Sequence, residues 1–562
     1  MDDLSPFSLV TEPWIRCQDA DGTDALLSLR DVFDGTGTVM GLRGDSPTQD
    51  YSVLRVLLAV YWRAHRRDTE VAPGRTFDME DWREEAWEKA TRGEPDSVVL
   101  DYLDQHRDRF DLLHAEHPFM QVADLRTSKD SRFPVARIVP EAESEYFSMR
   151  AGSSLESLPL DEAARWLIHA HAYDYSGIKS GAVGDPRVKG GRGYPIGTGW
   201  TGMTGGTTVL GGSLQETLVL NTAPAALLAG EEDRPVWERE PDGPAERRFP
   251  APKGPADLAT WQSRRIRLFR DGDRITGVLV SNGDRIPDAG ANVWGDTMTP
   301  YRYSTNKSSK TEDVYYARPY DAHRMMWRSL EPLIALDGDV ALARGEKSGR
   351  RPETLDALAT ARDAGLPESQ SVLNIRLTSM SYGPQSSSVA TTVDARIDLP
   401  LALLAPAAGP VRQAVLTNAK STLAAAVALG VFGGRLLMAA GGEYSFQAMH
   451  TDSLLADLEP DFRQWLASLD PPSADAPMAT WQQLVEARVR NRADILLRGA
   501  GPKALIGREI VQNERVTLLT AGTAYSRLQH ELRKALPLLP APPKSAEPST
   551  HLDLAQELTT DA

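Results

Sequence analysis

The amino-acid pattern changes at Asp398-Leu399-Pro400, and this change limits how the 562-residue chain can fold. From Leu401 onward alanine and leucine dominate, and apolar residues recur at helical spacing. Four helices joined by short connections favour an antiparallel bundle. The expected helices are approximately Val411–Phe432, Ser445–Ser468, Ala479–Arg498 and Asn513–Ala535.

The chain before this change mixes short strands with helices. A helix is predicted to begin near Ser46-Pro47-Thr48, with one buried face that includes Tyr51 and Leu54. Alternating residues predict two hairpins, which pair Ile266–Phe269 with Ile275–Val280 and Leu373–Ser381 with Val389–Ile397. The whole pattern predicts an α+β fold. Its expected parts are a large mixed domain with short β-sheets and helices over 1–397, an all-α four-helix bundle over 398–536 and a disordered, acidic, proline-rich tail over 537–562.

Net charge and cysteine content narrow the function. The formal net charge of −16 has the wrong sign for a protein that grips nucleic acid alone, because phosphate contacts need lysine and arginine. Any nucleic-acid contact is therefore expected in local basic loops. The single cysteine, Cys17, excludes an internal disulfide framework and indicates a reducing cytoplasm. The acidic N-terminus does not resemble a signal peptide, and no apolar run predicts a membrane partner.

The stretch Ile178–Leu210 contains ten glycines and four basic residues against one acid. Bare backbone lets N–H groups approach a ligand closely, and this density gives few side chains to a core, so packing explains it poorly. The stretch suits phosphate or a DNA groove, and the alternative is a mobile surface loop. Gly197, Gly199 and Gly202 fit G-x-G-x-x-G, but no strand and helix flank them as a dinucleotide site requires. We reject the nucleotide interpretation.

Two other loops carry candidate binding residues. Lys307 and Lys310 lie in a hydroxyl-rich loop from which a lysine could reach a groove or a phosphate, or simply be solvated. Gln385 and Ser386 lie at the predicted tip Tyr382–Ser388 of the second hairpin. Small polar side chains can probe base edges in a groove, although many hairpin tips have this composition.

Catalytic constellations are not recognisable in the sequence. It contains no P-loop, G-x-S-x-G, C-x-x-C or H-E-x-x-H motif. His114 and His117 flank Glu116, but Pro118 breaks any helix there and no further ligand set is evident, so a structural turn is favoured over a metal site. We predict a binding protein without catalytic residues, metal or cofactor. A nuclease whose metal-binding carboxylates are distant in sequence and a purely architectural protein stay open as alternatives.

Taken in order, several segments resemble one known family, the CasA family, the large subunit of the type I-E CRISPR Cascade surveillance complex. The resemblance covers about residues 9–535, and His114–Gln121 (HAEHPFMQ) is its most specific mark. The other marks are Glu12-Pro13-Trp14-Ile15, Gly202–Thr207, the loop from Trp294 to Pro300 with its following lysine, Gln385 and the C-terminal bundle.

The resemblance implies a non-catalytic subunit in antiviral defence. Such a subunit recognises the short motif beside the target, the PAM, from the minor groove of double-stranded DNA. It then wedges the duplex open to start R-loop formation and recruits a helicase–nuclease. Its implied partners are target DNA and the crRNA-containing Cascade with its backbone and small subunits.

By position, the resemblance also implies individual roles. The glycine loop would lie within Gly202–Gly206 and include Gly205, the lysine finger would be Lys307 with Lys310 as the fallback, and the wedge would be Gln385. Pro384 and Ser386 stand where the family has asparagine and alanine.

Overall fold

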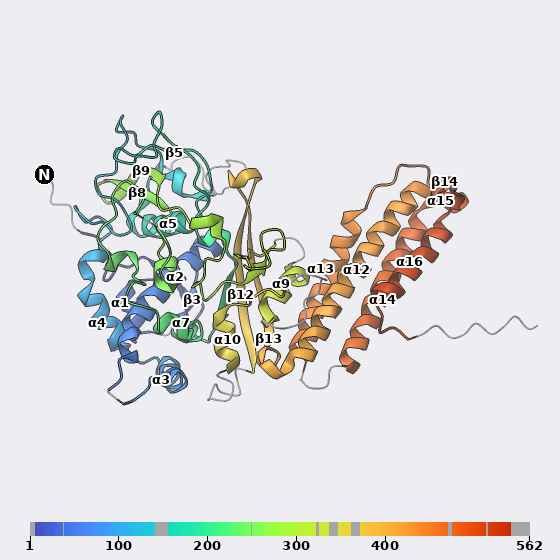
Figure 1. Cartoon of the computed structure of the whole chain (residues 1–562), viewed down its shortest axis with the longest axis horizontal. Helices are drawn as coiled ribbons and strands as arrows, with labels where there is room; N and C mark the ends of the chain where they lie inside the picture. Colours follow the sequence, from blue (N-terminus) through green and yellow to red (C-terminus); the bar gives the residue numbers. More distant parts are fainter. Residues whose placement is uncertain are drawn as a thin grey trace, which may run out of the picture. The chain divides into compact units, whose positions relative to one another are not determined.

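The structure is a computed structural model that describes residues 6–37, 39–72, 74–140, 156–248, 250–321, 325–336, 347–360, 371–469, 475–512 and 515–540. The chain divides into two compact units (Figure 1). Met1–Ala419 with Leu455–Ala474 form the first unit, and Lys420–Leu454 with Asp475–Ala562 form the second. The domain boundaries expected at 397/398 and 536/537 stay a prediction, and most of the expected tail, 541–562, lies outside the described residues.

The described strands form small antiparallel sheets. Three-stranded sheets have the orders β2-β1-β3, β13-β12-β7 and β4-β9-β8, and the pairs β5-β6, β10-β11 and β14-β15 stand alone. The strands are β1 Ile15–Asp19, β2 Asp24–Leu27, β3 Val39–Leu42, β4 Leu158–Pro159, β5 Lys179–Ser180, β6 Arg192–Gly193, β7 Gly206–Leu210, β8 Arg264–Asp271, β9 Arg274–Asn282, β10 Tyr301–Tyr303, β11 Tyr315–Ala317, β12 Val372–Tyr382, β13 Val389–Pro400, β14 Arg508–Gln512 and β15 Arg515–Leu519.

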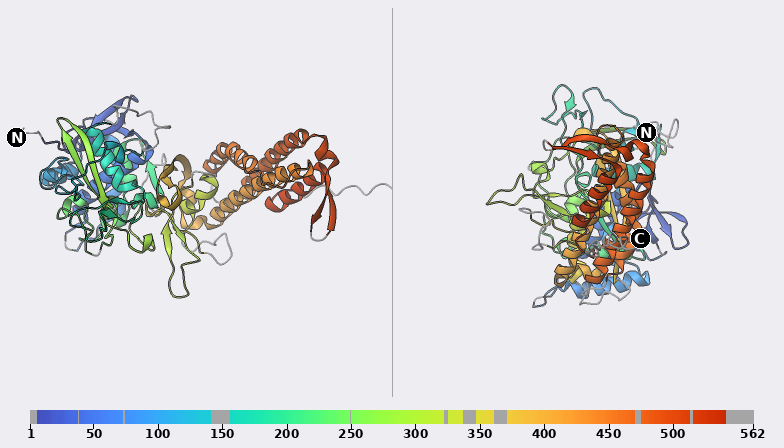
Figure 2. Two further views of the ribbon diagram at one scale, coloured as in Figure 1. Left: turned by 90° about the horizontal axis from the view of Figure 1, so that it is seen from above. Right: turned by 90° about the vertical axis from the view of Figure 1, so that its right-hand side faces the viewer.

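Helices surround these sheets in the first unit and dominate the second (Figures 1 and 2). The predicted mixed α+β fold with a helical C-terminal region is therefore confirmed. The helices are α1 Leu29–Phe33, α2 Pro47–His65, α3 Met79–Arg92, α4 Ser97–Gln105, α5 Leu160–Tyr173, α6 Leu214–Leu220, α7 Pro224–Leu227, α8 Pro255–Ala259, α9 Met325–Ile334, α10 Glu353–Thr360, α11 Leu401–Leu404, α12 Gly409–Ala439, α13 Ala448–Ala467, α14 Asp475–Gly499, α15 Gly501–Ile506 and α16 Ala521–Ala535.

Helix α2 is the central helix of the first unit. The Ser46 side chain caps it by accepting the Gln49 N–H, and Pro47 occupies its first turn, as the sequence predicts. The prediction of a single buried face was too narrow, because every residue of α2 except Pro47 and Arg63 is buried. A helix that is apolar nearly all round packs on several sides, and α2 contacts α4, α5 and α8.

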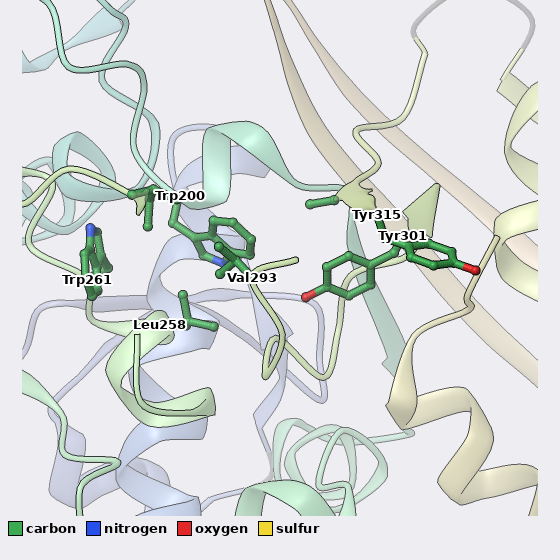
Figure 3. Close-up of a cluster of buried hydrophobic side chains, with 8 residues drawn as sticks. Trp200, Leu258, Trp261, Val293, Tyr301 and Tyr315 are labelled. Carbon is green, nitrogen blue, oxygen red and sulfur yellow. The ribbon is translucent and has the colours of Figure 1, made fainter. Parts of the chain in front are cut away.

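A buried aromatic cluster joins the glycine-rich stretch to the β10–β11 hairpin. Trp200 packs with Trp261, Val293 and the tyrosines Tyr301 and Tyr315 (Figure 3). These side chains come from segments that lie up to 115 residues apart in the sequence, from Trp200 to Tyr315. The cluster therefore fixes the base of the hairpin whose loop contains Lys307.

Most of the predicted C-terminal helices are present, but the start of the last one was wrong. Residues 513–520, expected to be helical, precede α16, and β14 and β15 pair where the fourth helix was to begin. Val516 and Thr517 are β-branched and favour a strand, and Thr520 starts α16 with a capping box. In the second unit, Arg435 of α12 pairs with Glu531 of α16 at 2.9 Å. The four-helix bundle as such stays a prediction.

One helix segment among the described residues, Pro406–Ala439, is long and apolar enough by length and composition to cross a membrane. This helix is an exception to the expectation that no apolar segment of the chain is long enough to span a membrane. Core helices of soluble proteins pass the same test, and 61% of the apolar window is buried.

A buried histidine gives the first unit a testable pH dependence. His65 bonds Asp68 at 2.7 Å and Asp96 at 2.8 Å. Burial alone would lower the pKa of His65, but these hydrogen bonds outweigh it and raise the pKa to about 9. The folded pKa of His65 exceeds the unfolded one, so protonated His65 stabilises the folded state. This contribution to the free energy of unfolding is complete below about pH 6.5 and is lost as pH rises through 9. Its size is about 3 kcal/mol.

Urea unfolding of wild type and His65→Gln at pH 6 and at pH 9.5 checks this prediction. The difference in free energy of unfolding between wild type and His65→Gln is expected to be smaller at pH 9.5 than at pH 6. His530→Gln, at an exposed position in α16, serves as the control. An advantage that is equal at both pH values would contradict the assignment.

Candidate nucleic-acid interface

The β12–β13 hairpin ends in a strained polar tip. Its two strands are antiparallel, and their register places Ile375 opposite Ile397. Gln385 and Ser386 both have positive φ, +57° and +53°. The left-handed region costs a non-glycine residue roughly 1–2 kcal/mol, and such strain tends to gather at functional sites. The Gln385 side chain is exposed.

Hydrogen bonds hold this tip against the segment that follows α5. The Ser176 N–H donates to the Ser386 carbonyl at 2.7 Å. The Tyr382 hydroxyl donates to the Tyr173 carbonyl at 2.8 Å. A Cβ at Gly202 would lie 2.2 Å from that hydroxyl oxygen, so the glycine lets the hairpin pack closely here.

Gly205 and Gly206 are buried and also closely packed. A Cβ on Gly205 would lie 2.5 Å from the Arg318 carbonyl oxygen, and one on Gly206 would lie 2.5 Å from the Tyr51 ring. The Gly205 N–H donates to the Thr299 hydroxyl at 3.2 Å. The argument that packing poorly explains these glycines is therefore wrong. No local signal reveals this packing, since Thr299 lies 94 residues away. Their role toward DNA stays a prediction.

Lys307 and Lys310 are exposed in the β10–β11 loop. The loop is internally bonded: the Ser304 N–H donates to the Val314 carbonyl at 2.8 Å, and the Val314 N–H donates to the Ser308 hydroxyl at 2.9 Å. Figure 2 shows the hairpin reaching away from the rest of the unit. Neither lysine forms an ion pair with the residues that the structure describes.

The segment 201–206 lies between the two hairpins. Gly202 packs under Tyr382 of β12, while Gly205 bonds Thr299 and packs on Arg318, which flank β10 and β11. The structure thus places the 201–206 segment against Tyr382, close to the Gln385 tip, and against the base of the hairpin whose loop contains Lys307. It shows no contact between the Lys307 and Gln385 side chains within its described ranges.

A buried ion cluster that the sequence did not indicate lies close to the Ser176–Ser386 contact of the β12–β13 tip. The Asp174 carboxylate accepts from both terminal nitrogens of Arg137 at 3.0 Å, from the Arg264 guanidinium and, at 2.9 Å, pairs with Lys179. Burial would raise the pKa of Asp174, but the Arg264, Lys179 and Arg137 charges hold it well below its usual range. Burial lowers the pKa of Lys179 to about 8, against the opposing attraction of Asp174.

The histidine motif forms a structural turn. His114 Nδ1 accepts the N–H groups of Glu116 and His117, and the two histidine rings stack with centroids 3.5 Å apart. The Gln121 amide donates to the Leu112 carbonyl and accepts the Leu268 N–H, each at 2.8 Å. Among the described residues, no group of three or more His, Cys, Asp or Glu is placed to hold a metal.

Residues 8–491 match the family model of the CRISPR-associated protein Cse1. A curated relative, the CRISPR-associated protein CasA/Cse1 of Thermus thermophilus, is 29% identical over 288 residues, which cover 49% of this chain and 51% of the relative. The match thus spans about half the length of that relative.

Solved structures match along most of the chain. Thermobifida fusca Cse1 is 36% identical with a TM-score of 0.83, and the match covers 95% of this chain and 99% of that one. A chain of a CRISPR RNA-guided surveillance complex shares the fold with a TM-score of 0.67 at 18% identity, covering 94% of this chain and 99% of that one. The resemblance seen in the sequence is therefore confirmed: the chain belongs to the CRISPR-associated protein Cse1 family.

Proposed function

We propose that this chain is the large, non-catalytic subunit of a guide-RNA-loaded type I-E Cascade in the cytoplasm. There it recognises the PAM in double-stranded DNA, opens the first base pairs and recruits the helicase–nuclease. Its other partners are the crRNA, the backbone subunits and the small subunits. Family membership and the fold shared with a chain of a CRISPR RNA-guided surveillance complex support the proposal.

The strained tip at Gln385 is the observation that carries the proposal. The long β12–β13 pair and the Ser176–Ser386 hydrogen bond hold an exposed amide on a fixed backbone. An amide can donate and accept, so it can replace hydrogen bonds of a separated base pair. Inserting a side chain between stacked base pairs costs a few kcal/mol for each step that is unstacked. Because the backbone of the Gln385 tip is already ordered, binding adds little further loss of conformational entropy.

Lys307 supplies the positive charge for groove recognition. The minor groove carries a degenerate pattern of acceptors, so a flexible lysine suits tolerant recognition of a short motif. Base pairing with the guide then carries the remaining sequence identity. This division of labour agrees with a net charge of −16, because other subunits would hold the guide RNA.

The described residues offer no observation that favours the nuclease alternative. Metal-assisted hydrolysis needs carboxylates or histidines grouped around the cation. Across the described ranges no such group of three or more is found. No observation therefore favours this second function.

The test uses the guide-loaded complex reconstituted with wild type, Lys307→Ala or Gln385→Ala. Matched duplexes differ only in the flanking trinucleotide, and 2-aminopurine beside it reports strand opening. Lys307→Ala is expected to reduce discrimination between flanks by about tenfold, the loss of one base-edge contact of about 1–3 kcal/mol. Gln385→Ala is expected to bind the duplex but to leave it closed.

Matched variants separate side-chain effects from backbone effects. Lys310→Ala changes charge in the same exposed loop, and its effect is expected to be smaller. Gln385→Asn keeps an amide on a residue type that tolerates positive φ, so it is expected to restore part of the opening. If neither Lys307→Ala nor Gln385→Ala alters binding or opening, both loops are scaffold and the proposal fails.

A further inference from the structure

The tip of the loop between β5 and β6 presents two cations side by side. Gly190 and Gly191 both have positive φ, +59° and +74°, which matches a two-residue type I′ hairpin turn. Lys189 and Arg192 flank this turn and exchange backbone hydrogen bonds of 3.0 and 3.1 Å. Residues paired in this way project their side chains from the same face.

This pairing is electrostatically unfavourable within the chain alone. Like charges directly opposite each other destabilise a hairpin. Lys189 and Arg192 are exposed and form no ion pair with the described part of the chain. The only acid of the stretch, Asp185, is occupied by Arg187 at 2.9 Å. The tip therefore carries two uncompensated positive charges in a protein of net charge −16.

An exposed aromatic residue follows the two cations. Tyr194 is 54% exposed. Its backbone is fixed, because the Asn282 amide donates to the Tyr194 carbonyl at 2.6 Å. Cations together with an aromatic face that is free to stack on a base are the features of sites for single-stranded nucleic acid.

Both ends of this loop are anchored beside the wedge. Lys179 at its start pairs with Asp174 at 2.9 Å. The Arg264 guanidinium, bound to the same carboxylate, donates to the Gly197 carbonyl at 2.9 Å near its end. Ser176, two residues after Asp174, donates to the Ser386 carbonyl. The ion cluster thus ties the loop and the Gln385 tip to one support.

We propose that Lys189, Arg192 and Tyr194 form a contact for single-stranded DNA that receives a strand separated at the Gln385 tip. The two cations bind its phosphates and the tyrosine stacks on a base. This inference rests on the proposed function. It moves the nucleic-acid contact of the glycine-rich stretch from the buried glycines Gly202–Gly206 to the exposed tip.

The experiment uses the guide-loaded complex and a target whose first base pairs are already open as a mismatched bubble. Lys189→Ala/Arg192→Ala is expected to weaken bubble binding and to lower the slope of log Kobs against log salt by about 1.4, since each single-strand phosphate contact contributes about 0.7. Tyr194→Ala is expected to weaken binding roughly 5- to 150-fold, and Tyr194→Phe to preserve it. Arg75→Ala/Arg107→Ala removes the same charge at exposed positions and is expected to change little.

The bubble makes this inference separable from the proposed function. The bubble needs no strand opening, so a complex with Gln385→Ala is expected to bind it normally. Complexes with Lys189→Ala/Arg192→Ala or Tyr194→Ala are expected to bind it more weakly than wild type. If the tip variants bind like wild type, the inference is overturned even where Lys307→Ala and Gln385→Ala behave as proposed. Equal losses on bubble and closed duplex, or a loss of guide RNA from the complex, would also overturn it. If the Lys189, Arg192 and Tyr194 variants lose bubble binding while Lys307→Ala and Gln385→Ala have no effect, the single-strand contact is supported and the proposed function is rejected.

Discussion

Replacing Asp174 by alanine is expected to lower the free energy of unfolding of the first unit by about 3 to 5 kcal/mol. Asp174, Lys179 and Arg264 side chains are 5%, 2% and 1% exposed. Removing the carboxylate leaves these cations buried without their shared anion, and such charges lose both hydration and their partner. Thermal and urea unfolding of the purified chain measure the loss.

Two further variants identify the cause. Asp174→Asn keeps the shape but removes the charge, and is expected to lose most of the same free energy. Asp24→Ala removes an acid that is 52% exposed and lies 3.3 Å from Arg43, and should cost less than about 1 kcal/mol. An Asp174→Ala protein as stable as Asp24→Ala would show that the cluster contributes nothing.

The Asp174 contribution also has a defined pH range. The folded pKa of Asp174 lies below the unfolded value, so its stabilisation is present above about pH 4 and is lost as pH falls toward the folded pKa. The difference between wild type and Asp174→Asn should therefore narrow on acidification. This direction is opposite to that expected for His65.

Gly205→Ala is expected to destabilise the chain by about 3 kcal/mol. The new Cβ would lie 2.5 Å from the Arg318 carbonyl oxygen and 2.9 Å from the Tyr320 ring. Backbone cannot move away cheaply, and a shift of Gly205 would break its bond to Thr299. The measurements are the unfolding midpoint of the purified chain and the DNA affinity of the guide-loaded complex reconstituted with it.

Gly230→Ala provides the matched control. A Cβ there meets no atom within 4 Å, and its φ is not positive, so the change should be neutral or stabilise by up to about 1 kcal/mol. A Gly205→Ala chain that unfolds like wild type but no longer binds DNA would assign the glycine to the ligand rather than to packing.

Local patterns predicted the elements that depend on neighbouring residues. The turn at Gly272 between β8 and β9, the β12–β13 hairpin and the Ser46 cap all follow from spacing within a few residues. The Val516-Thr517 hairpin was missed because residues around it alternate weakly and the flanking sequence is helical.

The contacts that hold the candidate site in place could not be predicted from local sequence patterns. Asp174 and Arg264 are 90 residues apart, and Ser176 and Ser386 are 210 apart. Burial and pairing of these groups depend on the tertiary fold, which periodicity does not contain. The glycines at 202, 205 and 206 were singled out correctly as unusual, yet the neighbours that require them are Tyr382, Arg318 and Tyr51.

The way the chain alternates between its two units has a consequence for synthesis on the ribosome. The first unit needs Leu455–Ala474, which is made only after Lys420–Leu454 of the second. At 5–20 residues per second, the 55 residues from 420 to 474 take roughly 3–11 s to synthesise. A nascent chain that has passed residue 419 therefore still lacks a segment of its larger unit. Exposed core surface during this interval makes the newborn protein a candidate client for chaperones that act during translation.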